Sequence, residues 1–206
     1  MMAASRPTAN LVPALRNAAA ASPVWLRTIG IAVLGSAFVA ACAHVALPLY
    51  FTPVPLTLQP FAVLLLGLLL SPRLAAATLL TYLGEGAVGL PVFSPGVMSA
   101  PGLAHLFGPT GGYLLAYPLA AVLISYLFRP SSRSFASAIL SAAAGDLVIL
   151  VCGAFWLAIL THTSWQLLLT QAILPFLPGD ALKVIGAAAL VAGWQRLRNS
   201  RAVPTT

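Results

Sequence analysis

Long apolar runs recur along most of the chain and are separated by short breaks rich in proline, glycine or arginine. Folded as helices, these runs would be hydrophobic on every side, with almost no polar surface to cover them in water. They predict an all-α integral membrane protein with six transmembrane helices. The predicted helices cover residues 24–49, 56–70, 73–89, 110–128, 135–160 and 178–196.

Proline marks the breaks between several of these helices. The Pro-Val-Pro sequence at 53–55 follows the first, Ser71-Pro72 ends the short second, and Pro178 suits the first position of the last. Two connections are longer. Residues 90–109 are rich in glycine and proline, and residues 161–177 are expected to carry a short amphipathic helix. Long connections without regular structure are often lids or binding elements.

The two ends of the chain differ in composition from the apolar runs. Residues 1–23 are rich in alanine, serine and proline, which predicts a flexible cytoplasmic extension before a six-helix membrane domain at 24–197. Residues 198–206 are expected to form a cytoplasmic tail. An alanine- and serine-rich stretch resembles a signal-peptide cleavage site, but it precedes the first apolar run. We therefore expect no cleaved signal peptide.

Composition supports a membrane protein, since 60% of the 206 residues are hydrophobic, 6% are charged, and the mean hydropathy is +0.99. The net charge of +7 comes from dispersed arginines, so we expect no nucleic-acid partner. Cys42 and Cys152 lie in apolar runs and are interpreted as small core residues without a disulfide. His44, His105 and His162 lack the spacing to cysteines or acids that a metal site requires.

The positions of the arginines test the number of spans. Arg6, Arg16 and Arg27 precede or open the first predicted helix, and Arg73 lies between the second and the third. Arg129 and Arg133 lie between the fourth and the fifth, and Arg196, Arg198 and Arg201 follow the sixth. The other three connections contain no lysine or arginine. By the positive-inside rule, six spans then place both termini in the cytoplasm and the long connections outside.

Asp180 and Lys183 are the first candidates for a working site. The chain has three acidic residues and one lysine, and these two are spaced i, i+3 in an apolar run, so they share a helix face. A charge deep in a bilayer costs about 2.5–3.5 kcal/mol on insertion scales. The pair either stabilises helix packing or hydrogen-bonds a small polar ligand. In the six-span topology it lies near the outer end of the last helix, beneath the 90–109 connection.

Other polar residues are weaker candidates. Glu85 near the outer end of the third helix either faces the same cavity or lies at the water interface. Asp146, in the middle of the fifth, is interpreted as a buried structural carboxyl group, with a ligand or proton role as the alternative. Gln59 either caps the second helix or contacts ligand. Four aromatic side chains are candidates for an apolar wall of the pocket: Tyr82, Phe93, Tyr113 and Trp156.

Four segments together resemble the BioY family, the biotin-specific S components of energy-coupling factor (ECF) transporters. The first two are Pro53-Val-Pro-Leu-Thr-Leu-Gln59 and Gly86-Ala-Val-Gly-Leu-Pro-Val-Phe93. The other two are Gly108-Pro-Thr-Gly-Gly-Tyr113 and Pro178-Gly-Asp-Ala-Leu-Lys183. The resemblance extends over about residues 25–195 and does not include the N-terminal extension.

The resemblance implies a six-helix S-component fold in the bacterial inner membrane that binds biotin from the outside. It implies no enzymatic activity and no cofactor. The partners it implies are a transmembrane T subunit, contacted through Ala37 and Ala41, and two ABC-type ATPases. It also implies that Asp180 and Lys183 contact biotin. Some members add an asparagine from the 90–109 connection. This connection has none here, so that contact is either absent or made by another group, such as Ser99 or a backbone group of the connection.

Three alternatives remain open from the sequence. The first is an S component for another vitamin, such as a thiamin or riboflavin precursor. The second is a solitary secondary carrier that needs no ATPase. The third is an intramembrane enzyme that uses Asp146 and Asp180, which would require the two carboxylates to meet. The glycine-rich segment at 108–113 lacks the lysine and the following hydroxyl residue of a phosphate loop, so the energy for any active transport must come from another subunit or from an ion gradient.

Overall fold

The computed structural model describes residues 23–95, 101–128, 134–162 and 164–200. Within them, each of the six predicted helices is present. These are α2 (Val24–His44), α3 (Gln59–Leu69), α4 (Pro72–Ala87), α6 (Gly111–Leu127), α7 (Phe135–Thr161) and α9 (Leu177–Ser200). Ser99 and the residues before 23 or after 200 lie outside the described part of the chain, and α9 continues four residues beyond its predicted end at 196.

In the described part of the chain, three helices are long and apolar enough to cross a membrane: α2, α7 and α9, with 21, 27 and 24 residues. Helices α3 and α6 are apolar but shorter. At a rise of about 1.5 Å per residue, the 11 residues of α3 extend over roughly 16 Å, about half of a bilayer core of about 30 Å. The short second helix predicted from the sequence is therefore confirmed, and the chain is a multi-pass, mostly helical membrane protein.

The connection between α2 and α3 differs from the prediction. A helix was expected to continue to Leu49, but α2 ends at His44. Pro48 explains the early end, because a proline disfavours helical backbone at the residue before it. The chain instead forms β1 (Ala46–Leu47), which pairs antiparallel with β2 (Leu56–Thr57). This ribbon brings residues 54–57 back over the start of α3.

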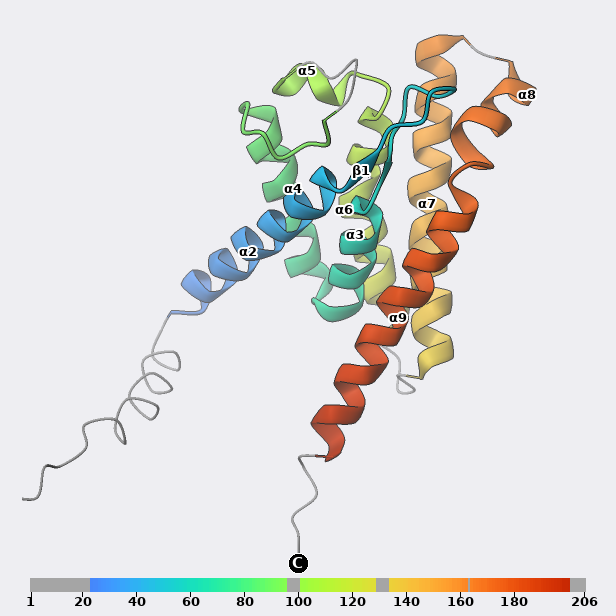
Figure 1. The fold of residues 1–206 in the computed structure, drawn as a ribbon. Coiled ribbons are helices and arrows are strands. Elements are labelled where there is room, and N and C mark those ends of the chain that lie inside the picture. The colour runs from blue at the N-terminus through green and yellow to red at the C-terminus, as the bar shows by residue number, and fades with distance from the viewer. Residues whose placement is uncertain (1–22, 96–100, 129–133, 163, 201–206) are drawn as a thin grey trace, which may run out of the picture.

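The longer connections contain short helices. Helix α5 (Leu103–Leu106) lies between α4 and α6, and α8 (Trp165–Leu168) with the π-helix η2 (Leu169–Ile173) lies between α7 and α9. The short helix predicted within residues 161–177 is therefore confirmed. In Figure 1 the β-ribbon, α5 and α8 lie at one end of the bundle, whereas α2 begins and α9 ends toward the opposite end.

Helices α6 and α7 approach each other closely through glycines. A Cβ atom on Gly112 would collide with Trp156 of α7, and one on Gly153 would collide with the ring of Tyr113 on α6. Small residues at such positions let helix backbones pack closely in membranes, where van der Waals contact drives association. The close approach places the Tyr113 ring of α6 directly against Gly153 of α7.

Candidate ligand-binding site

A pocket lies where α3 and α9 begin, between these helices, α6 and α7. The empty space at this site is about 500 Å³ with the open mouth included. Apolar lining comes from Val54, Pro55, Pro60, Leu114, Ile149, Leu150 and Phe176. Polar lining comes from Thr57, Gln59, Ser94, Thr110, Tyr113, Tyr117, Asp146, Asp180 and Lys183. Because α3 is short, the extended residues before it form one wall.

The ion pair predicted from the sequence is present in this pocket. Lys183 Nζ lies 2.8 Å from Asp180 Oδ1, and the two residues are 8% and 6% exposed. Both lie in the first turns of α9, and the Asp180 backbone N–H donates to the carbonyl of Phe176 at 2.8 Å. A carboxylate is favoured near a helix N-terminus by the helix dipole. Pairing removes much of the cost of burying each charge, and both groups keep unused hydrogen-bonding capacity.

Gln59 lines the pocket at the N-terminus of α3 and is 2% exposed. Its Nε2 donates to the hydroxyl of Tyr82 at 2.5 Å, and that hydroxyl donates to the carbonyl of Val92 at 3.0 Å. Tyr82 therefore lies behind Gln59 and orients it. With the amide nitrogen bonded in this way, the amide oxygen of Gln59 is the group available to accept a hydrogen bond from a ligand.

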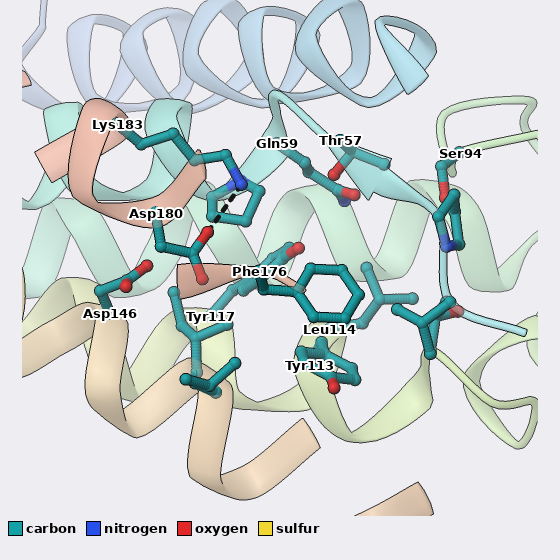
Figure 2. Close-up of a pocket in the computed structure, with 16 residues that line it drawn as sticks. Thr57, Gln59, Ser94, Tyr113, Leu114, Tyr117, Asp146, Phe176, Asp180 and Lys183 are labelled. Atoms are coloured by element: carbon teal, nitrogen blue, oxygen red, sulfur yellow. Dashed lines mark hydrogen bonds and ion pairs between the residues drawn. The ribbon is translucent and has the colours of Figure 1, made fainter. Parts of the chain in front are cut away.

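Aromatic side chains form another part of the lining. The Tyr113 hydroxyl donates to the carbonyl of Ala172 in η2 at 3.1 Å, which ties α6 to the segment leading into α9. The ring of Phe176 lies 6.3 Å from that of Tyr113, centre to centre. Tyr117 lies one turn further along α6 and also lines the pocket. Figure 2 shows these rings between the ion pair and Ser94.

The structure brings together four of the eight predicted ligand-binding residues: Asp180, Lys183, Gln59 and Tyr113 line the pocket. The other four have different neighbours. Glu85 Oε1 accepts from Ser36 of α2 at 3.0 Å, and Trp156 Nε1 donates to the carbonyl of Gly108 at 2.9 Å. The rings of Tyr82 and Phe93 pack edge to face with 5.5 Å between centres.

Several lining residues were not among the sequence candidates, namely Thr57, Ser94, Thr110, Tyr117 and Phe176. Tyr117 alone carried a usable signal, because it follows Tyr113 by four residues and so shares its helix face. Asp146, interpreted from the sequence as structural, lines the same pocket as Asp180. Among the described residues no group of histidines, cysteines and acids is arranged to hold a metal ion.

The two ends of the pocket differ in charge. Asp146, Asp180 and Lys183 lie at one end in Figure 2, and Ser94 lies at the other. Neutral and mainly apolar groups separate them. Such a site suits an elongated small molecule with a hydrogen-bonding head, an apolar middle and a polar tail. Two carboxylates beside one lysine favour a head group that donates more hydrogen bonds than it accepts.

Ala37 and Ala41 lie outside this site. Both are exposed on α2, on the face opposite the buried residues Ala32, Val39 and Ala43. On an α-helix, positions four apart lie one above the other, so the two alanines form a flat patch where another helix can approach closely.

Comparisons with known proteins match most of the chain. A family model described as the BioY family matches residues 13–200. "Biotin transporter BioY2" of Lactococcus lactis subsp. cremoris is 36% identical over 160 residues, which are 78% of this chain and 85% of the relative. "Probable biotin transporter BioY" of Pyrococcus horikoshii is 40% identical over 138 residues, 67% of this chain and 78% of the relative.

The fold also matches a solved structure. A crystal structure described as the S-component for biotin from an ECF-type ABC transporter superposes with a TM-score of 0.74 and 27% sequence identity. The match covers 84% of this chain and 92% of that one. The likeness therefore extends through the whole bundle and is not confined to one motif.

Proposed function

The chain belongs to the BioY family, and we propose that it binds biotin in the pocket described above, as the substrate-binding S component of an ECF transporter. The observation that carries this proposal is the buried Asp180–Lys183 ion pair in the wall of a mainly apolar pocket. The family comprises transporter components and not enzymes. In this role the chain performs no bond-breaking chemistry, and its residues only recognise and release the vitamin.

The chemistry of biotin matches the order of groups along the pocket. Its ureido ring has two N–H donors and one strong acceptor, its thioether ring is apolar, and its tail ends in a carboxylate. Asp180 accepts an N–H, and Lys183 donates to the ureido oxygen. The thioether ring packs against Phe176 and Leu114. The carboxylate points toward the Ser94 end, away from the two acidic side chains.

We further propose a topology with six spans in the bacterial inner membrane, with both termini in the cytoplasm. The arginine distribution supports it, because all nine arginines fall on one side of a six-span chain. The pocket then opens outward, since it lies at the end of the bundle where α3 and α9 begin. The connection between α4 and α6 contributes Ser94 and Thr110 to its lining.

Ligand specificity is the first test of this function. Purified protein in lipid nanodiscs is expected to bind about one radiolabelled biotin per chain, since the proposed site accepts one molecule. Unlabelled biotin should displace the label, whereas thiamin and riboflavin in about hundredfold excess should not, because neither presents a cyclic urea with two N–H donors to the acidic end. Displacement by another vitamin, or no saturable biotin binding, would contradict the proposed ligand.

The exposed alanine patch on α2 is proposed to contact the T subunit of the coupling module. Ala37→Leu is expected to lower co-purification of the T subunit by about fivefold or more, because a larger side chain separates closely packed helices. Biotin binding to the isolated chain should not change. Ala143→Leu on the exposed face of α7 is the matched control.

Cells with and without the T and ATPase subunits provide the functional readout for this contact. The proposal requires that biotin uptake falls when these subunits are absent and when Ala37 is enlarged. Undiminished uptake without them would instead identify a solitary carrier.

A further inference from the structure

Asp146 is a buried carboxylate that the ion pair does not use. It lies in the middle of α7, is 9% exposed and lines the pocket. Among the described residues no hydrogen bond or ion pair reaches its side chain, since Lys183 bonds to Asp180. No fully buried side-chain oxygen or nitrogen among the described residues lacks a hydrogen-bond partner, so the unpaired carboxylate oxygens of Asp146 open into the pocket that the residue lines. Asp146 is therefore available to a ligand in a way that a structural carboxyl group is not.

The surroundings of Asp146 decide what kind of ligand group it accepts. It interacts electrostatically with both Asp180 and Lys183, which belong to a different helix, α9. In Figure 2 Asp146 and Asp180 lie at the same end of the pocket, each from its own helix. Lys183 is the only cation among the lining residues. This end of the pocket thus presents two carboxylates and one ammonium group, which repels an anionic ligand group and favours a neutral group with two donors.

We propose that Asp146 is a specificity-determining residue that accepts a hydrogen bond from one ureido N–H while Asp180 accepts one from the other. A cyclic urea carries its two N–H groups on either side of its carbonyl. Acceptors that come from two different helices, α7 and α9, suit such divergent donors, and Lys183 beside Asp180 suits the carbonyl oxygen. This inference rests on the proposed biotin function. It assigns to Asp146 the binding role that the sequence left as the alternative.

The wild-type protein allows a first test. Two carbamate analogues of biotin, each with one ureido N–H replaced by oxygen, keep the size of the ring and remove one donor. If each N–H has its own carboxylate partner, both analogues should bind at least about tenfold more weakly than biotin, because each leaves a buried acceptor unpaired and facing an oxygen. Full affinity for either analogue would overturn the inference. Absence of biotin binding would instead contradict the proposed function.

Asp146→Ala then identifies which donor the carboxylate accepts. Biotin should bind about tenfold more weakly to this variant. One of the two carbamates should lose most of its penalty relative to biotin, and the other should keep its own. A merely structural role would weaken all three ligands in the same proportion, which would overturn the inference. Asp146→Asn preserves the side-chain size and is used if Asp146→Ala does not fold. Leu147→Ala, at the neighbouring position that is 59% exposed, is the matched control.

Discussion

Lys183→Ala is expected to lower the affinity for biotin at least tenfold. A hydrogen bond from a charged donor contributes about 1.5–3 kcal/mol, so its loss alone corresponds to roughly ten- to a hundredfold in affinity. The remaining carboxylates of Asp180 and Asp146 would also face the ligand carbonyl with no cation beside them. Asp180→Asn should have an effect of at least the same tenfold order. Equilibrium binding of radiolabelled biotin to the protein in nanodiscs measures both.

Folding must be separated from binding in these variants. Removing one partner of a buried ion pair destabilises a protein by about 3–5 kcal/mol, whereas replacing both with apolar residues of similar size is often neutral. The double variant Asp180→Leu with Lys183→Met is therefore expected to melt near the wild-type temperature and still not bind biotin. If this variant keeps wild-type affinity, the pair has a packing role only and the site assignment is wrong.

The sequence predicts the helices well because each is a local feature. Apolar runs of sufficient length and the prolines between them locate all six helices, including the short α3. The end of α2 was misplaced because Pro48 was counted inside an apolar run. The β-ribbon that follows could not be predicted, since each of its strands has only two residues and their pairing depends on tertiary structure.

The candidate site was predicted where charge makes a residue conspicuous. Asp180 and Lys183 are costly in an apolar chain, and their spacing places them on one helix face. Ser94 and Thr110 carry no such signal, because only the folding of the α4–α6 connection brings them to the pocket. Conversely, Glu85 has a charge but lies against Ser36 of α2. Its distance from the pocket depends on which face of α4 packs inward, which the sequence did not decide.

The short α3 leaves space for the pocket. A helix of full membrane length at this place would fill the space that the pocket occupies. Instead the chain enters the bundle as an extended segment, and Val54, Pro55 and Thr57 contact the same space as the ion pair. Within the Pro-Val-Pro sequence, Val54 and Pro55 thus form part of one wall of the site.

Gly153→Ala is expected to disturb the pocket by displacing the ring of Tyr113, which lines it. The added methyl group would overlap the ring of Tyr113, and neither backbone can withdraw easily because α6 and α7 are closely packed. Overpacking of this kind costs about 1–3 kcal/mol. Displacement of the ring would also break the hydrogen bond from its hydroxyl to the carbonyl of Ala172. We expect a lower melting temperature and about tenfold weaker biotin binding, measured by thermal unfolding and equilibrium binding on the same samples.

Two further variants show whether the Tyr113 ring is the cause. Gly193→Ala, where a Cβ atom meets nothing within 4 Å, should leave binding unchanged and stabilise α9 slightly, because alanine has about 1 kcal/mol higher helix propensity than glycine. Adding Tyr113→Leu to Gly153→Ala relieves the overlap and should restore the melting temperature, but not the affinity, since the hydroxyl that ties α6 to η2 is gone. A Gly153→Ala protein with wild-type melting and affinity would show that this contact does not position the pocket wall.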